Sequence, residues 1–271
     1  MFFLVAKVRG VPMTPYEFRM KKEAEAQALK SGNGNIKKIH NSFIQSAIHG
    51  SNQQALKVIF YLSSILEDLE MDKEHFTVVI DYEKALKFTG ITDAEFTRTL
   101  KAMQSVSITF VDEVEKYEEY INLMPRIKRL YGKKQVEIDL YAKVARLIID
   151  VPKQIGGTML NVKEICKLKS KHSVRLLPIL HMINGFEYPA EKKKTYSLPE
   201  LNDIFGVSYK KFDDIEKRIL KEVQHELNTT SKMGFTYEVN MGYYGIAKGR
   251  PKALSITITP VVKKYVQGKL L

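Results

Sequence analysis

Residues 197–228 read SLPELNDIFGVSYKKFDDIEKRILKEVQHELN, and they predict two helices separated by a glycine turn. Ser197 is a good helix N-cap, and Pro199 suits a first helical turn because its missing amide proton would have no partner there. Gly206 readily takes the left-handed conformation that ends a helix. Residues 210–228 predict a longer helix with one buried face, because their apolar side chains recur at helical spacing. These apolar residues are Phe212, Ile215, Ile219, Val223 and Leu227.

Two strands are expected after these helices. Residues 235–240 and 254–259 have the composition of strands, and residues 241–252 would connect them. Before the two helices of 197–228, residues 173–184 predict another helix, in which Pro178 should cause a kink or shift the helix boundary. A helix, a short helix, a glycine turn, a longer helix and a β-hairpin form the winged-helix version of the helix-turn-helix. In that fold the longer helix can enter a DNA major groove.

The same order occurs in the first half of the chain. A shift of 116 positions carries Gly90 onto Gly206 and Phe96 onto Phe212. The other pairs at this shift are Asp81 with Ser197, Ile91 with Val207, Lys101 with Lys217, and Met103 with Ile219. Because caps, turn glycines and buried-face residues share one offset, we predict two copies of one α+β unit.

The first copy predicts elements in the same sequence. Helical spacing of apolar residues begins at Ile39, Ser51 is a candidate N-cap of a second helix, and Asp81 caps a short helix. Residues 93–105 predict the longer helix, and residues 77–80, 106–111, 117–130 and 134–140 predict strands. The predicted fold class is α+β, with two tandem winged-helix domains. We expect an arm and linker over 1–35, an N-terminal winged helix over 36–150 and a C-terminal one over 151–271.

Positive charge is concentrated in the second copy. The chain has 271 residues and a formal net charge of +12. Residues 1–150 hold 22 basic and 20 acidic side chains, whereas residues 151–271 hold 21 basic and 11 acidic ones. A basic surface attracts phosphate backbones and releases their counterions, so nucleic acid is the leading candidate partner. The alternative is a basic protein whose charge only keeps it soluble.

The candidate DNA contacts are basic residues outside the apolar stripe. In the second copy these are Lys210, Lys211, Lys217, Arg218 and Lys221 on the longer helix, with Lys248, Arg250 and Lys252 on the wing. The first copy offers Thr92, Thr97, Arg98 and Lys101. Arginine can pair with base edges through two hydrogen bonds, whereas lysine mostly holds phosphate. A solvated helix face is the alternative interpretation, which Asp213, Asp214 and Glu216 keep open.

The sequence argues against an enzyme and predicts neither a cofactor nor a metal site. A rolling-circle initiator is the enzymatic rival, but its His-x-His pair is absent because no two of the six histidines are two positions apart. No phosphate-binding G-x-x-x-x-G-K-[ST] loop occurs. The acidic residues from Glu67 to Glu74 lack the glycine of a calcium loop. Cys166 is the only cysteine, which excludes an internal disulfide and is typical of a protein in a reducing cytoplasm. A single cysteine among aliphatic residues is more often a small core residue than a reactive thiol. No apolar run is long enough to cross a bilayer, and the opening residues do not resemble a signal peptide.

The chain resembles the replication initiators (Rep proteins) of theta-replicating, iteron-containing plasmids, which consist of two winged helices. The C-terminal resemblance comprises SKHSVRLL (170–177), SLPEL (197–201), FGV (205–207), DIEKRIL (214–220), ELN (226–228) and Gly249-Arg250. The N-terminal resemblance comprises Asn41, IDYEKAL (80–86) and TGIT (89–92). It covers roughly residues 36–260 in the family's order, and the arm before residue 36 lies outside it.

The resemblance implies a bacterial cytoplasmic, plasmid-associated protein that binds repeated origin sites in double-stranded DNA. It implies that monomers start replication, whereas dimers repress the initiator's own gene. The C-terminal copy would dominate sequence reading, and the N-terminal copy would contribute DNA contact and dimerisation. The host replicative helicase and the chromosomal initiator would be protein partners. By position, Lys217 and Arg218 fall in the family's basic recognition-helix segment, and Gly249-Arg250 falls at its wing. Glu216 stands where the family can have a further basic residue, so the resemblance does not imply a DNA contact at that position. The alternatives are a winged-helix repressor without an origin function and a protein-interaction module.

Overall fold

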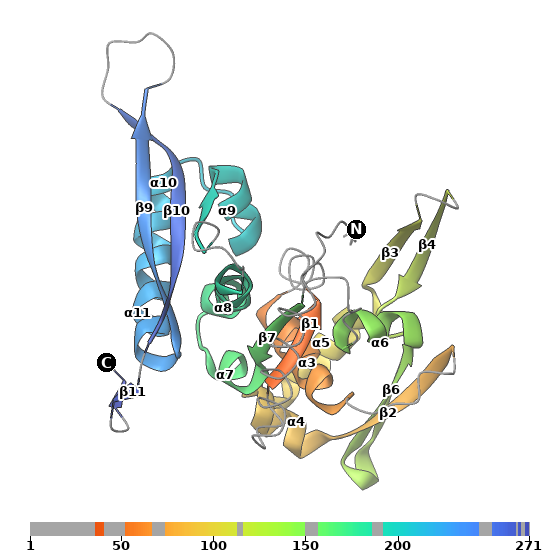
Figure 1. Cartoon of the computed structure of the whole chain (residues 1–271). Helices are drawn as coiled ribbons and strands as arrows, with labels where there is room; N and C mark the ends of the chain where they lie inside the picture. Colours follow the sequence, from red (N-terminus) through yellow and green to blue (C-terminus); the bar gives the residue numbers. More distant parts are fainter. Residues whose placement is uncertain are drawn as a thin grey trace, which may run out of the picture. The chain divides into compact units, whose positions relative to one another are not determined.

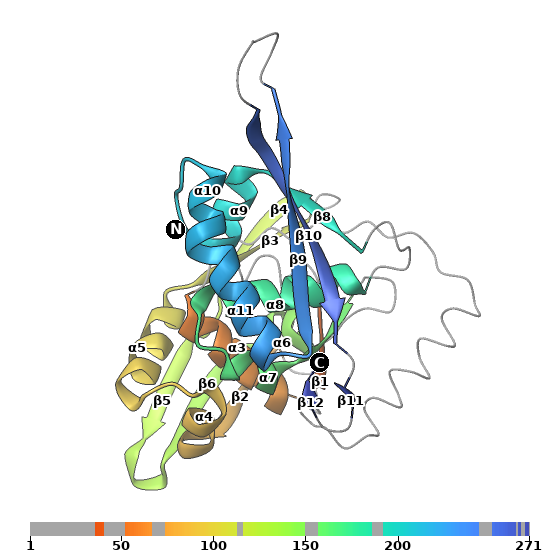
Figure 2. The same ribbon diagram turned by 90° about the vertical axis from the view of Figure 1, so that its left-hand side faces the viewer.

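The structure, a computed structural model, describes residues 36–40, 52–66, 74–112, 116–149, 157–185, 192–243, 251–263, 265–266 and 269–270. The predicted arm over 1–35 lies outside the described residues. The chain divides into two compact units, Met1–Lys167 (the first unit) and Leu168–Leu271 (the second unit). Each is described by itself (Figures 1 and 2).

In its described residues, the first unit combines helices with three small antiparallel sheets. Its helices are α3 (Gln53–Ile65), α4 (Tyr82–Thr89), α5 (Asp93–Gln104), α6 (Ala142–Ile149) and α7 (Val162–Lys167). Its strands are β1 (Ile36–His40), β2 (His75–Asp81), β3 (Ser107–Asp112), β4 (Tyr117–Asn122), β5 (Arg126–Leu130), β6 (Gln135–Tyr141) and β7 (Gly157–Asn161). The strands pair as β1-β7, β3-β4 and β2-β6-β5, and a 3₁₀ turn at Tyr131–Lys133 joins β5 to β6.

The second unit repeats the central part of this arrangement. Its helices are α8 (Lys171–Asn184), α9 (Leu198–Phe205), α10 (Phe212–Ile215) and α11 (Lys221–Thr230), with a π-helical segment over Glu216–Leu220. Its strands are β8 (Lys194–Tyr196), β9 (Met233–Gly242), β10 (Lys252–Val262), β11 (Tyr265–Val266) and β12 (Lys269–Leu270). The sheet order β8-β10-β9 matches β2-β6-β5, with the strand before the short helix at one edge and the last hairpin strand in the centre. This common strand order supports the duplication inferred from the sequence.

The short helices α4 and α9 are eight residues long in both units, and they begin and end in the same way. The side chains of Asp81 and Ser197 accept hydrogen bonds from the first-turn amides of α4 and α9. Gly90 and Gly206 end these helices at φ values of 66° and 63°. The predicted caps and turn glycines are therefore confirmed, and each glycine lies where other residues would be strained.

The helix after the glycine turn begins differently in the two units. Thr92 and Glu95 form a capping box, so α5 begins at Asp93, directly after Thr92. The shift of 116 positions puts Ser208 and Lys211 in their places, and a lysine side chain cannot accept a hydrogen bond. The second unit's helix therefore begins at Phe212, two residues after the predicted start at residue 210. We call residues 212–230, from α10 through the π-helical segment to α11, the long helix.

The long helix buries the predicted apolar stripe against the rest of its unit. Phe212, Ile215, Ile219, Val223 and Leu227 are all buried. The helix lies against strands β9 and β10 (Figures 1 and 2). The opposite side of the helix is thus left to its polar and charged residues.

Two sequence predictions for the first unit were wrong. The single strand over 117–130 is two strands, because Leu123 and Met124 are buried between them and Pro125 has no amide proton to continue a ladder. The helix predicted to begin at Ile39 is strand β1 up to His40, which pairs with β7. Residues 41–51, including the predicted cap Ser51, lie outside the described residues, and Asn52 is the N-cap of α3.

The boundary between the units also differs from the predicted one. Strand β7 pairs with β1, and α7 packs on α3, so residues 157–167 accompany the first unit and not the second. We therefore propose a boundary at Lys167 and Leu168 in place of residues 150 and 151. Residues 151–167, between the predicted boundary and the proposed one, show no change of composition that would mark the boundary at Lys167.

We expect Gly206→Ala to destabilise the protein more than Gly90→Ala does. Both substitutions place an L-residue at positive φ, which costs roughly 1–2 kcal/mol. At Gly206 the added Cβ would also lie 2.2 Å from Arg175 Nη1, whereas at Gly90 the nearest atom is 3.9 Å away. Urea unfolding of the full chain measures the difference. Gly132→Ala is the control, because nothing lies within 4 Å of its added Cβ; an equal loss in all three variants would contradict the expectation.

Candidate nucleic-acid interface

Five of the predicted DNA contacts lie in the long helix or just before it. Lys210 and Lys211 precede α10, Lys217 and Arg218 lie in the π-helical segment, and Lys221 is the first residue of α11. All five residues are exposed, and Lys217, Arg218 and Lys221 lie on the side of the helix opposite its buried stripe. The structure thus brings together the basic side chains that the sequence predicts.

Acidic residues of the same helix accompany three of these basic side chains. The closest N···O distances are Lys217–Asp213 3.9 Å, Arg218–Asp214 3.5 Å and Lys221–Glu216 3.9 Å. Such exposed pairs contribute only about 0.3–0.5 kcal/mol each, so a phosphate group can replace the carboxylate at little cost. Glu216 is also held by Tyr237, whose hydroxyl donates to its carboxylate over 3.2 Å.

Helix α8 supports the turn that precedes the long helix. Arg175 Nη1 donates to the carbonyl oxygen of Ile204 over 3.3 Å, at the C-terminal end of α9, where a cation is favoured by the helix dipole. His172 packs edge-on against Phe205 with 5.5 Å between ring centroids. Burial, assisted by the positive charges of Lys171 and Arg175, lowers the pKa of His172 to about 4. The imidazole is therefore neutral at physiological pH.

The wing of the second unit is described only in part. Lys252 is the exposed first residue of β10 and lies opposite Gly242 in the ladder. Lys248 and Arg250, which the sequence also predicts as wing contacts, lie outside the described residues. The wing strands are longer than the sequence predicts, since β9 and β10 extend into residues 241–252, the predicted connection between them.

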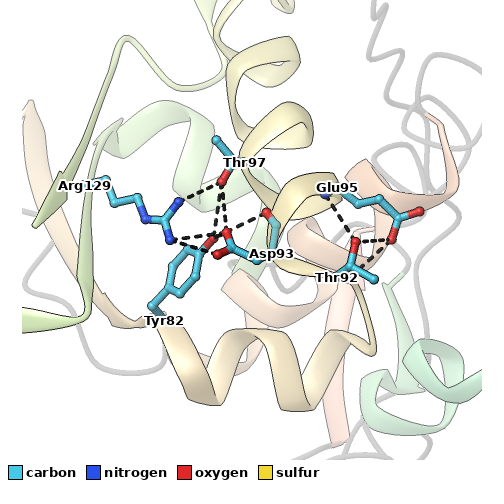
Figure 3. Close-up of polar contacts among 6 residues, drawn as sticks. All are labelled: Tyr82, Thr92, Asp93, Glu95, Thr97 and Arg129. Atoms are coloured by element: carbon cyan, nitrogen blue, oxygen red, sulfur yellow. Dashed lines mark hydrogen bonds and ion pairs between the residues drawn. The ribbon is translucent and has the colours of Figure 1, made fainter. Parts of the chain in front are cut away.

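The two threonines predicted as DNA contacts in the first unit bind the unit's own residues. Thr92 Oγ1 donates to the Glu95 carboxylate over 2.8 Å and accepts from the Glu95 amide, as Figure 3 shows. Thr97 Oγ1 accepts from Arg129 Nη1 over 3.0 Å and lies 3.2 Å from the Tyr82 hydroxyl. Arg98 and Lys101 are exposed on the same helix, α5. Of the four predicted residues, these two present their charge to solvent.

Strands β5 and β6 pair as a hairpin, which is the wing of the first unit. Arg129 on β5 is the centre of a polar cluster that joins this wing to α5 (Figure 3). Its guanidinium lies 3.2 Å from the Asp93 carboxylate and 4.0 Å above the Tyr82 ring, and the Tyr131 ring is 4.8 Å away. The Tyr82 hydroxyl also donates to Asp93. The hydrogen bond from Tyr82, followed by that from Arg129, holds the pKa of Asp93 below its ordinary value. A carboxylate therefore occupies the first turn of α5.

Sequence reasoning missed this cluster because Asp93 and Arg129 are 36 positions apart. A local signal for the wing did exist, since residues 126–134 read RIKRLYGKK and contain five basic side chains. Arg126 and Lys128 on this segment lie 3.7 Å and 3.6 Å from Glu137 on the neighbouring strand. The signal indicates a basic wing, but only the sheet register shows that carboxylates accompany it.

Other chemical candidates in the sequence have ordinary structural roles or lie outside the described residues. Cys166 is 2% exposed, its thiol contacts the Lys57 carbonyl oxygen, and burial raises its pKa to about 12. Of the acidic stretch Glu67 to Glu74, only Glu74 is described. Within the described part of the chain, no group of three or more metal-ligating side chains occurs, and no helix is long and apolar enough to span a membrane.

Comparison with known families and structures agrees with the two winged helices. Residues 36–181 match the family described as Initiator Replication protein, WH1, and residues 197–259 match Initiator Rep protein, WH2. The chain belongs to this family of initiator Rep proteins.

The fold of the chain also resembles that of a solved structure. The chain is similar to a crystal structure of the Pi initiator protein in complex with iteron DNA, with a TM-score of 0.62 and 14% sequence identity. The match covers 86% of this chain and 100% of the Pi chain. No curated protein sequence matches significantly. The predictions of a Rep initiator and of two winged-helix domains are thus confirmed.

We expect the second unit to lose stability in acid because of His172. Its folded pKa of about 4 lies below the value of about 6.5 for an unfolded histidine, so the unfolded state binds the proton first. This contribution is complete above pH 6.5 and falls by about 1.4 kcal/mol per pH unit as the pH drops toward 4. Urea unfolding of the full chain at pH 5 and pH 7 measures it. His172→Gln should show a smaller difference between the two pH values, and an unchanged difference would contradict the assignment.

We expect Arg129→Met to loosen the contact between α5 and wing strand β5. The variant keeps an unbranched, flexible side chain but loses the guanidinium and its charge-assisted hydrogen bonds, for a cost of about 1–2 kcal/mol. Hydrogen exchange measured by mass spectrometry should become faster in peptides from α5 and β5. Lys128→Met is the control, since Lys128 is 53% exposed and pairs only at the surface. Equal exchange in the two variants would disprove a special role for Arg129.

Proposed function

We propose that the chain initiates replication of a bacterial plasmid by binding repeated origin sites (iterons) in double-stranded DNA. The observation that carries this proposal is the presence of both initiator domains, WH1 and WH2, in one chain and in the family's order. The similar Pi initiator protein was crystallised with iteron DNA, which supports the same class of ligand for this chain.

The second unit supplies most of the sequence reading in this proposal. Its long helix carries exposed Lys217, Arg218 and Lys221, and residues 151–271 hold nearly all of the chain's excess positive charge. Arg218 reads base edges, and the lysines, with Lys248, Arg250 and Lys252 on the wing, bind phosphate. The first unit contributes weaker contacts, because Thr92 and Thr97 are bound internally and α5 begins with Asp93. Arg98 and Lys101 are its phosphate contacts.

Origin opening follows from DNA deformation and from protein recruitment. Binding to tandem sites bends or destabilises the adjacent duplex, and the energy for this comes from additional protein–DNA contacts. The chain then recruits the host replicative helicase and the chromosomal initiator. A dimer formed through the first unit represses the chain's own gene. The chain requires no cofactor to bind and deform the DNA.

Footprinting on the DNA that flanks the gene tests this function. We expect protection that repeats at about one or two helical turns of roughly 10.5 base pairs each. A single protected inverted repeat would instead favour the alternative function, a winged-helix repressor that does not act at an origin.

We expect Arg218→Ala to weaken binding to the protected repeat by about tenfold or more, because a bidentate arginine–base contact is worth about 1–3 kcal/mol. Fluorescence anisotropy with the repeat and with a scrambled duplex of the same length measures this loss. Lys163→Ala is the matched control, because it removes the same charge from an exposed position on α7. Equal binding by the wild type and Arg218→Ala would place base reading elsewhere.

A further inference from the structure

In the turn between α9 and the long helix, the side chain of Asn202 binds both backbone polar groups of Tyr209. Asn202 Nδ2 donates to the Tyr209 carbonyl oxygen over 2.8 Å, and the Tyr209 amide donates to Asn202 Oδ1 over 3.1 Å. Asn202 is itself anchored, since its carbonyl oxygen accepts from the amide of Val207 over 2.9 Å. Both backbone polar groups of Tyr209 are thus satisfied in a non-helical conformation.

This conformation brings the Tyr209 ring to the long helix. The Arg218 guanidinium carbon lies 5.7 Å from the ring centroid, within the range of a cation–π contact. Arg218 Nε lies 3.5 Å from Asp214 Oδ1. A ring and a carboxylate therefore restrict a side chain that is 66% exposed and would otherwise sample many rotamers.

The contact depends on the late start of the long helix. If the helix began at residue 209, Tyr209 and Arg218 would be nine residues apart on one helix. At 100° per residue they would point to opposite faces, and about 13.5 Å of helix axis would separate them. Because the capping box is absent at Ser208 and Lys211, Tyr209 stays outside the helix, and its ring can approach Arg218.

The first unit provides an internal comparison. The shift of 116 positions places Leu86, Asp93 and Ala102 where the second unit has Asn202, Tyr209 and Arg218. None of the three can make the contact described above, and Asp93 is already inside α5. The arrangement therefore belongs to the second unit alone and is not a general requirement of this fold.

We propose that Tyr209 is a positioning residue for base reading by Arg218, with Asn202 holding its backbone in place. An aromatic face fixes the plane of a guanidinium and leaves its N–H edge free, which is the edge that binds guanine. The proposal rests on the proposed function, since it assumes that Arg218 reads bases. It adds that the conformation of the turn contributes to which DNA sequence is preferred.

The test compares binding to the protected repeat with binding to a scrambled duplex of the same length. Full-length Tyr209→Leu should lower the ratio of these affinities about two- to fivefold, as expected for loss of an exposed cation–π contact. Tyr209→Phe keeps the ring and should retain the wild-type ratio, which a role for the hydroxyl would not allow. Circular dichroism and hydrogen exchange in α9 establish that each variant is folded.

A double-mutant cycle separates positioning from a direct or purely structural role. In the Arg218→Ala background, Tyr209→Leu should no longer change the ratio. An unchanged twofold or larger loss in that background, or the same loss in Tyr209→Phe, would overturn the proposal and leave the proposed function intact. If the wild type itself fails to distinguish the repeat from the scrambled duplex, the proposed function fails, and the inference fails with it.

Discussion

The left-handed glycine at the end of each short helix sets the direction in which the next helix leaves. Gly90 and Gly206 both have φ near 65°, and each follows an eight-residue helix with an acceptor side chain at its N-cap. The following helix then buries Phe96 in one unit and Phe212 in the other. Because these aromatic side chains fix the rotation of the helix about its axis, they also decide which polar residues remain exposed. The candidate interface of each unit depends on this turn.

The two units use different means to support the same turn. In the first unit a capping box starts α5 at once, and Arg129 reaches from the wing to the first helical turn. In the second unit helix α8 supplies Arg175, whose guanidinium binds the end of α9 at the point where Gly206 has no side chain. The long helix starts later and leaves the Tyr209 segment outside it. Polar side chains of α5 and β5 in the first unit thus bind one another, whereas the basic side chains of the second unit's long helix are exposed to solvent.

Charge distribution follows the same division. The basic residues of the long helix are paired with carboxylates about one turn away. Residues 212–230 hold five acidic side chains against three basic ones, so the free helix is not itself positively charged. Exposed pairs of this kind are weak and screened by salt, so phosphates compete with them effectively. At Asp93 the carboxylate is instead held by Tyr82 and Arg129 together. That cluster connects α5 to strand β5, and the Asp93 carboxylate repels a nearby phosphate.

The sequence by itself determined the helix pairs, the N-caps of the short helices, the glycine turns, the buried stripe and the basic residues of the long helix. Each of these depends on residues within a few helical turns of one another, so local spacing is sufficient. Only the tertiary structure decided that β1 pairs with β7, that 117–130 divides into two strands, and that Arg129 meets Asp93. It also decided that the long helix begins late enough for Tyr209 to approach Arg218. These features depend on sheet register and on competition for backbone hydrogen bonds, which join residues that the local pattern treats as independent.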